Sequence, residues 1–263
     1  MPKSNNQRSL TQRAANRSPR RQPEKSWTDR RMIPLPLAPK TMSPVPHLTS
    51  IHSTSVRGPY GRSNYHGNCS GYLIKDLLRY FRSSRVLDPM TGSGTCADVC
   101  KELDIQHVSF DLKDGIDACD PGSYANLSPC DFVWLHPPYW RMIRYSDDPR
   151  CLSNAPSLSV FQKRMRSLIR CCISALTPYG TIAILIGDYL DRVEGKQMPI
   201  TYFTKQICLE LGLWPACTDI IRFQHGNTSS AKVYASSFIP GLHDTCLVMQ
   251  RHSAGNSLAS RHK

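Results

Sequence analysis

The residues best suited to chemistry follow a short apolar run at 131–135 and read His136-Pro137-Pro138-Tyr139. A neutral imidazole can accept one hydrogen bond, and prolines fix the local backbone so that a neighbouring carbonyl points in one direction. The aromatic ring that follows offers a flat surface for stacking. This order of residues at a strand end indicates a site that holds a flat object.

A second set of residues lies in a glycine-rich loop, DPMTGSGT at 88–95. Gly92 and Gly94 allow a tight turn and a close approach of a ligand, and the N–H groups of a following helix favour a carboxylate or phosphate. A plain tight turn is the alternative interpretation. Asp111 lies 23 positions after Asp88, and an acidic residue about 20 positions on pairs with ribose hydroxyls in nucleoside-binding sheets. Because G-x-G-x-x-G is missing, the pattern indicates a nucleoside ligand other than NAD.

Alternating strands and helices must position these residues. Apolar runs rich in Val, Ile and Phe alternate with stretches of helical spacing, which is the α/β pattern. The predicted strands are 85–89, 107–111, 131–135, 181–187, 218–223 and 245–250, and the predicted helices are 71–81, 96–103 and 160–176. No helical pattern joins the last two strands, so we predict that they form an antiparallel pair. The expected fold is Rossmann-like α/β, a mostly parallel twisted sheet with an antiparallel edge strand and helices on both faces.

The chain's charge is concentrated near its start. Of 263 residues, 40% are hydrophobic, which is enough for one sizeable core. Residues 1–40 carry ten Lys or Arg and two acids, and therefore +8 of the formal net charge of +13. We predict a basic disordered arm at 1–45, one domain at 46–252 and a flexible tail at 253–263. The arm fits nucleic acid as a partner, but a solvated tail has the same composition.

Neither a membrane segment nor a metal site is predicted. No apolar run reaches the roughly 18 residues of a membrane span, and no signal-peptide core follows Met1. The eleven cysteines form no paired C-x-x-C sets, so reduced thiols are expected instead of disulfides or metal ligands. We expect a cytoplasmic protein, nucleoid-associated or nuclear if the cell is eukaryotic.

The two motifs together carry a resemblance. DPMTGSGT followed by HPPYW resembles the S-adenosylmethionine-dependent amino-methyltransferases, and among them the DNA adenine-N6 and cytosine-N4 methylases, whose second motif is D-P-P-Y, N-P-P-Y or S-P-P-Y. The resemblance covers residues 65–249. It implies transfer of a methyl group from S-adenosylmethionine to an exocyclic amino group of a DNA base, with DNA held by the basic arm and by the loop at 141–159.

The resemblance also assigns roles to single residues. The catalytic set is His136, Pro137, Pro138 and Tyr139, with the first residue and a backbone carbonyl accepting hydrogen bonds from the amino group. The cofactor-binding set is Asn68, Asp88, Pro89, Thr91, Gly92, Gly94, Thr95, Asp111 and Asp117. The substrate-binding set is Trp140, Arg144, Tyr145 and Asp188, where Tyr139 and Trp140 are expected to stack on an extruded base.

His136 departs from the family's Asp, Asn or Ser, and this leaves the target base open. A protonated imidazole accepts no hydrogen bond, so activity is expected to fall at acidic pH if the side chain is the acceptor. Alternatively only its backbone carbonyl acts. Two other classes stay open: an RNA-guanine or protein-glutamine methyltransferase, and a non-catalytic nucleic-acid-binding protein on a decayed methylase fold.

Overall fold

The structure is a computed structural model that describes residues 40–54, 56–223, 239 and 241–251. The chain divides into two units, Met1–Leu37 and Ala38–Lys263, and every described residue belongs to the second. Most of the predicted basic arm and the predicted tail at 253–263 lie outside the described residues. Within those residues, no helix combines the length and apolar character needed to cross a membrane.

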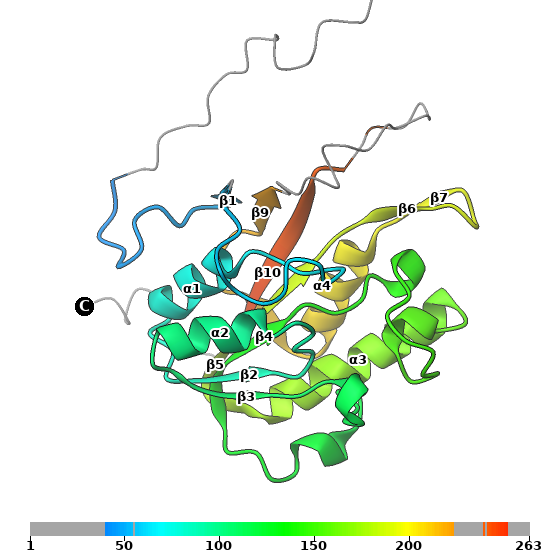
Figure 1. The fold of residues 1–263 in the computed structure, drawn as a ribbon, viewed down its shortest axis with the longest axis horizontal. Helices are drawn as coiled ribbons and strands as arrows, with labels where there is room; N and C mark the ends of the chain where they lie inside the picture. Colours follow the sequence, from blue (N-terminus) through cyan, green and yellow to red (C-terminus); the bar gives the residue numbers. More distant parts are fainter. Residues whose placement is uncertain (1–39, 55, 224–238, 240, 252–263) are drawn as a thin grey trace, which may run out of the picture. The chain divides into compact units, whose positions relative to one another are not determined.

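An eight-stranded mixed sheet forms the centre of the second unit (Figure 1). Its parallel half has the order β5-β4-β2-β3 and consists of β2 (Arg85–Asp88), β3 (Gln106–Ser109), β4 (Cys130–Leu135) and β5 (Leu176–Ile186). The other half consists of β10 (His243–Arg251), β9 (Ile220–Phe223), β1 (Ile51–His52) and β8 (Leu213–Pro215). The mostly parallel α/β sheet is therefore confirmed.

The antiparallel strand β10 has a different place from the one predicted. It pairs with β5 on one side and with β9 on the other, and it is antiparallel to both. The predicted antiparallel pairing of the last two strands is confirmed, but β10 lies inside the sheet because β9 and β1 continue beyond it. Asp244, near its start, is consequently buried.

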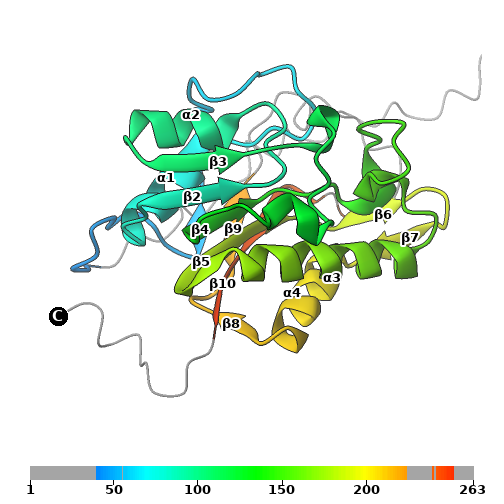
Figure 2. The same ribbon diagram turned by 90° about the horizontal axis from the view of Figure 1, so that it is seen from below.

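In the described part of the chain, two helices cover each face of the sheet (Figure 2). One face is covered by α1 (Gly71–Tyr80) and α2 (Thr95–Glu102), and the other by α3 (Leu158–Ser174) and α4 (Ile200–Glu210). Strand β4 contributes side chains to the core on both faces of the sheet, because successive side chains of a strand point to opposite faces. Phe132 belongs to the core with α1 and α2, and Val133 to the core with α3 and α4.

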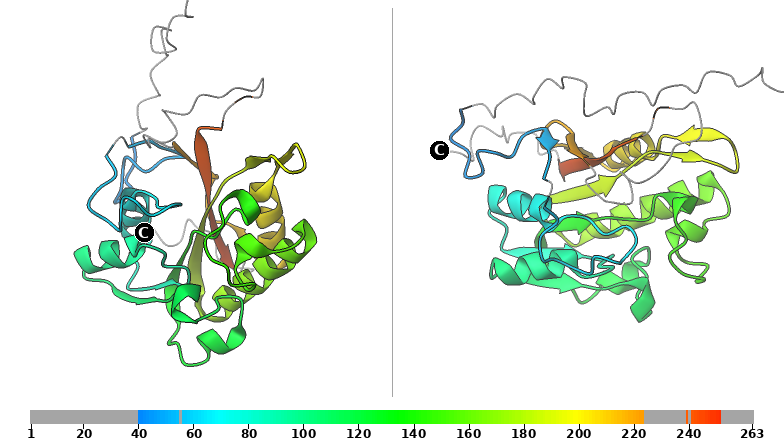
Figure 3. Two further views of the ribbon diagram at one scale, coloured as in Figure 1. Left: turned by 45° about the vertical axis from the view of Figure 1, so that its right-hand side comes forward. Right: turned by 45° about the horizontal axis from the view of Figure 1, so that its top comes forward.

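Several elements were not predicted from the sequence. They are β1, β8, α4 and the hairpin of β6 (Tyr189–Asp191) and β7 (Lys196–Met198), which pair with each other in a separate two-stranded sheet. The hairpin projects beyond the main sheet (Figure 3). Arg141, which follows the HPPYW motif, holds it through ion pairs with Asp191 and Glu194.

Removing the ring of Phe132 should destabilise the protein strongly, because its side chain is fully buried in the central strand. We expect Phe132→Ala to cost about 3–5 kcal/mol of unfolding free energy, measured by urea denaturation. Val193→Ala is the control, since Val193 is 79% exposed. Equal midpoints for the two variants would contradict the buried position of β4.

Candidate active site

A cavity of about 230 Å³ lies where β2, β3 and β4 end. Because these strands are parallel, their carboxyl ends meet at one edge of the sheet, where open α/β sheets bind ligands. Most of the residues selected from sequence share its wall: Asn68, Asp88, Pro89, Thr91, Gly92, Thr95, Asp111, Asp117, His136, Pro138 and Tyr145. The two sequence motifs are thus brought to one site, whereas Gly94, Pro137, Tyr139, Trp140, Arg144 and Asp188 are not part of the wall.

The glycine loop turns through two left-handed residues. Gly92 has φ 52° and Gly94 has φ 88°, a region that glycine enters without steric cost. A Cβ on Gly92 would lie 3.1 Å from the ring of Tyr65, a tight contact. Gly94 is the N-cap residue of α2; its role is to turn the backbone into the helix.

Asp111 braces the glycine loop from the neighbouring strand. Its Oδ2 accepts a hydrogen bond from Gly92 N at 2.8 Å, and its Oδ1 accepts one from Lys113 N at 3.2 Å. A carboxylate has about four acceptor sites, so two remain for donors inside the cavity. This arrangement suits a ligand with two adjacent hydroxyl groups.

Asp88 is the buried acid of the site. It is 3% exposed, and its Oδ1 accepts a hydrogen bond from Met90 N at 3.2 Å. Burial raises the pKa of Asp88 from 3.8 to about 7, and the neighbouring charge of Asp111 adds to the effect. Near neutral pH the cavity wall therefore holds a carboxyl group that is easily protonated and easily ionised.

The segment before α1 covers the glycine loop. Thr95 Oγ1 donates to Asn68 Oδ1, and Asn68 Nδ2 donates to Arg62 O at 2.6 Å. Tyr65 and Tyr145 stack with their ring centroids 6.4 Å apart. The residues before α1 and the residues after the HPPYW motif therefore meet beside the cavity. Asp117 lies farther along the wall, where its Oδ1 accepts from Cys119 N at 2.8 Å.

His136 is neutral at ordinary pH. Burial lowers its pKa from 6.5 to about 4, because desolvation disfavours the charged imidazolium. Its Nε2 lies 3.1 Å from the hydroxyl of Tyr139. The loss of activity at acidic pH that the sequence predicts should accordingly occur near pH 4 and not near the usual histidine pKa.

Tyr139 does not present its ring to the cavity. A Cβ on Gly187 would lie 2.8 Å from Cε2 of Tyr139 and 2.6 Å from Oδ1 of Asp244, so the ring packs against the end of β5. Burial raises the pKa of Tyr139 well above its usual value, and the neighbouring charge of Asp244 adds to the effect. Its predicted stacking on a base is not the arrangement in this structure.

Trp140 is a core residue, which corrects the prediction that it contacts substrate. Its side chain is 1% exposed, and its Nε1 donates to Ala155 O at 2.8 Å. A left-handed backbone at φ 50° turns the ring inward toward Phe161, while the Arg141 guanidinium lies 4.2 Å from the ring centroid. No surface of the ring is left for a base.

Two polar residues of the predicted substrate-binding set lie off the cavity wall, and their role stays a prediction. Asp188 is exposed, and its Oδ1 accepts from Thr201 N at 2.8 Å, so it caps the first turn of α4. Arg144 is 68% exposed and pairs with Asp147 at 2.8 Å.

In the same loop Arg150 does line the cavity, as do Tyr65 and Lys113, which were not selected from sequence. Lys113 donates a hydrogen bond to Gly92 O. Its position two residues after Asp111 was the one sequence feature that could have pointed to it.

The acidic and sulfur-bearing side chains are not clustered as metal ligands. In the described ranges, no group of three or more His, Cys, Asp or Glu side chains is placed to hold a metal ion. All eleven cysteines are free thiols. Burial raises the pKa of Cys69, which lines the cavity, to about 11, and this keeps it a protonated, poorly nucleophilic thiol.

Comparison with known proteins gives only distant likenesses. No protein-family model and no curated protein matches the chain. A Thermus thermophilus protein named provisionally as a DNA modification methylase is 17% identical, with a TM-score of 0.38 and 54% of each chain covered. The chain thus spans about half the length of that protein. The similarity to that protein covers only part of the α/β fold.

Two other solved structures are similar over more of the chain. An S-adenosylmethionine-dependent methyltransferase from Archaeoglobus fulgidus is 19% identical, with a TM-score of 0.41, over 70% of this chain and 95% of that one. The Burkholderia thailandensis 1,6-didemethyltoxoflavin-N1-methyltransferase is 11% identical, with a TM-score of 0.44, over 73% and 80%. All three scores lie below 0.5, so they carry no argument about activity, which must come from the cavity itself.

The raised pKa of Asp88 predicts a pH-dependent stability. The folded protein binds this proton more tightly than the unfolded chain, so the group's stabilising contribution is complete below about pH 4 and is lost as pH rises through about 7. Asp88→Asn should remove that loss and raise the unfolding free energy at pH 8 by up to about 4 kcal/mol, with no gain at pH 4. Thermal melts across this range measure it, with the exposed Asp114→Asn as control; a constant offset at every pH would refute the assignment.

The buried position of Trp140 predicts a stability effect. Trp140→Phe keeps a ring but leaves the carbonyl of Ala155 without its donor, at a cost of about 1–3 kcal/mol. Urea denaturation should show this loss, whereas Trp214→Phe should have little effect because Trp214 is 56% exposed. An unchanged midpoint for Trp140→Phe would argue against its place in the core.

Proposed function

We propose that this chain is an S-adenosylmethionine-dependent methyltransferase that methylates an exocyclic amino group of a DNA base, adenine N6 or cytosine N4. One observation carries the proposal. The glycine loop with Asp111 and the strand end with His136 line the same cavity. A nucleoside site and a hydrogen-bond acceptor suited to an amino group therefore face one cavity.

The cavity wall suits the cofactor's functional groups. Asp111 has acceptor sites for ribose hydroxyls, and Asp117 and the glycine loop at Gly92 lie on the same wall. The ionisable carboxyl of Asp88 favours a positively charged ligand nearby, because a cation stabilises its carboxylate form. When bound, S-adenosylmethionine supplies a methyl group on a sulfonium, and the C–S bond breaks with its electron pair left on sulfur as the N–C bond forms.

His136 is the residue suited to the amino group. An exocyclic amino nitrogen is a weak nucleophile because its lone pair is delocalised into the ring, so a fixed acceptor for its N–H is needed to localise that pair. Neutral His136 accepts such a bond, and the buried Pro137 restrains the backbone beside it. The proton lost from the methylated nitrogen passes to the imidazole, and a pKa of about 4 ensures its release to water at neutral pH.

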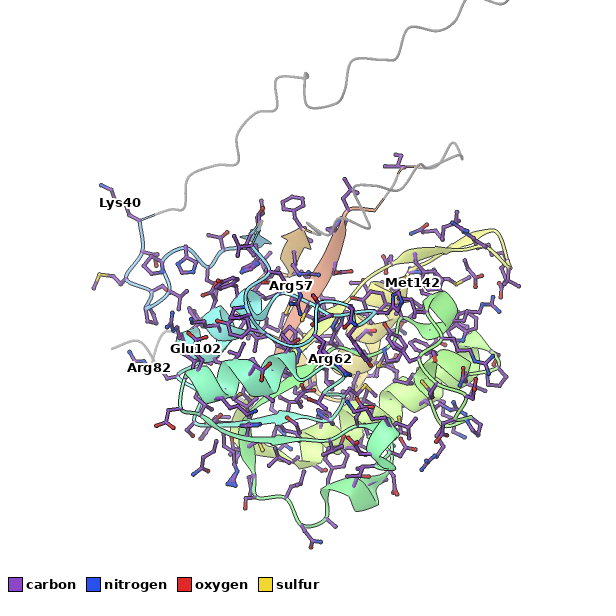
Figure 4. The ribbon with its side chains drawn as sticks, in the orientation of Figure 1. Lys40, Arg57, Arg62, Arg82, Glu102 and Met142 are labelled. Carbon is purple, nitrogen blue, oxygen red and sulfur yellow. The ribbon has the colours of Figure 1, made fainter. Side chains whose placement is uncertain are left out.

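Positive charge near the cavity supports a polynucleotide substrate. Arg150 and Lys113 line the wall, and Arg57 and Arg62 extend from the segment that crosses in front of the sheet in the view of Figure 4. Lys and Arg side chains of this kind contact phosphates and fix register without reading sequence. The formal net charge of +13 agrees with an anionic partner.

The proposal predicts methyl transfer that depends on Asp111. With labelled S-adenosylmethionine and unmethylated DNA, mass analysis should find N6-methyladenine or N4-methylcytosine. Asp111→Asn keeps an acceptor for Gly92 N but removes the charge, so the KM for the cofactor should rise on the order of 10-fold. The matched control is Asp114→Asn, three residues away and exposed.

Parallel reactions with bulk RNA and with protein separate the other substrate classes. Label found only in RNA or only in protein would replace DNA in the proposal and keep the amino-methyltransferase chemistry. Cofactor binding with no label in any polymer would refute the proposed enzyme and favour the non-catalytic nucleic-acid-binding protein.

A further inference from the structure

The β6–β7 hairpin leaves the sheet at the edge where the cavity lies. Strand β5 runs parallel to β4, with Leu135 paired with Ile184, so β5 ends at the same edge of the sheet as His136. The hairpin begins at Tyr189, soon after that end, and it extends past the main sheet (Figure 3). A large substrate whose reacting group reaches His136 therefore approaches the hairpin as well.

A buried ion pair fixes the hairpin to the segment after the HPPYW motif. Asp191 is 2% exposed, and its Oδ2 accepts a hydrogen bond from Arg141 Nε at 2.6 Å. Its Oδ1 accepts one from Val193 N at 2.9 Å. Glu194 in the turn pairs with the same guanidinium at 2.7 Å. Because an arginine fork holds carboxylates in a fixed orientation, the hairpin keeps one direction relative to that segment.

Arg141 also contacts the motif itself. Its guanidinium lies 4.2 Å from the centroid of the Trp140 ring, within the range of a cation–π interaction. The ring is held in turn by the hydrogen bond from Trp140 Nε1 to Ala155 O at 2.8 Å. Since Trp140 directly follows Tyr139, these contacts set the place of the hairpin relative to His136.

The tip of the hairpin presents cations around an apolar side chain. Val193 is 79% exposed, and Arg192 and Lys196 are exposed as well. Lys196 forms a long ion pair with Glu194, at 3.9 Å. Within the part of the chain that the structure describes, the Arg192 side chain forms no ion pair. The charge of Arg192 is therefore available to an anionic partner.

The chemistry of the tip favours DNA over a protein partner. Residues 191–197 contain no aromatic side chain, whereas protein interfaces are enriched in aromatic residues and depleted in lysine. Lysine and arginine contact phosphates. A two-stranded β-ribbon fits the major groove of B-DNA, where the methyl of thymine is the apolar group on offer. A hairpin that carries an exposed valine with two cations matches that groove.

We propose that the β6–β7 hairpin enters the major groove of DNA beside the target base, with Arg192 and Lys196 on phosphates and Val193 on a thymine methyl. This inference rests on the proposed function for DNA as the substrate, and it adds an element that selects among sequences. Because Arg141 anchors the hairpin beside the motif, the thymine lies at a fixed distance from the methylated base. A preference for thymine at one position near that base follows.

The phosphate contacts are measured by fluorescence anisotropy with the full-length protein, S-adenosylhomocysteine and a thymine-containing duplex over a range of salt concentrations. Arg192→Gln and Lys196→Gln should each weaken binding and reduce the slope of log K against log salt concentration by about 1. Their affinity for S-adenosylhomocysteine should be unchanged, because the tip does not line the cavity. Slopes equal to that of the wild type in both variants would overturn the proposal.

Arg82→Gln is the matched control. Arg82 is an exposed cation shortly before β2 begins, so it lies near the opposite edge of the parallel strands from the cavity; Figure 4 labels it. Its salt slope should equal that of the wild type. A loss of slope as large as in the tip variants would show that the tip charges act only through net charge, which contradicts a contact by the hairpin.

The groove contact is tested with duplexes that carry uracil in place of thymine and therefore lack the methyl group. The wild type should bind the uracil duplex about 4-fold more weakly, as expected for one buried methyl. Val193→Ala should bind both duplexes equally, because the contact is already lost. Equal affinity of the wild type for the two duplexes would overturn the major-groove contact.

The proposed function fails separately from this inference. If the salt slopes and the effect of uracil are as expected but labelled S-adenosylmethionine modifies no DNA base, the hairpin contact stands and the assigned reaction does not. If DNA is methylated while the Arg192 and Lys196 variants bind it like the wild type, the reaction stands and the hairpin contact does not.

Discussion

The parallel pairing of β2 with both β3 and β4 determines where the glycine loop, Asp111 and His136 lie. Leu87 is paired with Val108 on one side and with Val133 on the other, so the three strands end together. The loop after β2, Asp111 after β3 and His136 after β4 consequently open on one cavity. Turning any one strand around would send its terminal residues to the opposite edge of the sheet, and the site would not exist.

Burial then sets the protonation of the two central groups in opposite directions. Desolvation raises the pKa of Asp88 and lowers that of His136, because an apolar surrounding disfavours the charged form of each. The site thus contains a neutral imidazole acceptor and a carboxyl group that ionises when a cation approaches. Both properties suit a sulfonium ligand beside a polar, uncharged amino group, and they follow from the position of the residues more than from their type.

The sequence was sufficient for the parts of the site that depend on local pattern. The glycine loop and the prolines act on their own backbone, so residue types and spacing were enough to place Gly92, Asp111 and His136 at strand ends, and all three line the cavity. Trp140 could not, since its inward direction follows from a left-handed backbone at φ 50°. The contact of Asp188 with the start of α4 could not be predicted because α4 itself was not predicted. The buried positions of α4 include the polar Thr204, while the large Tyr202 is exposed. Tyr139 and Asp244 are brought near each other because β4 and β10 both pair with β5, an arrangement between distant segments that no local pattern contains.

The central claim is that one cavity holds the cofactor against the His136 strand end. A crystal structure of the protein with S-adenosylhomocysteine tests it most directly. We predict that the ribose hydroxyls will bind the carboxylate of Asp111, and that the thioether sulfur will lie at the His136 and Pro138 side of the cavity. A ligand bound elsewhere, or with its sulfur turned away from His136, would contradict the account.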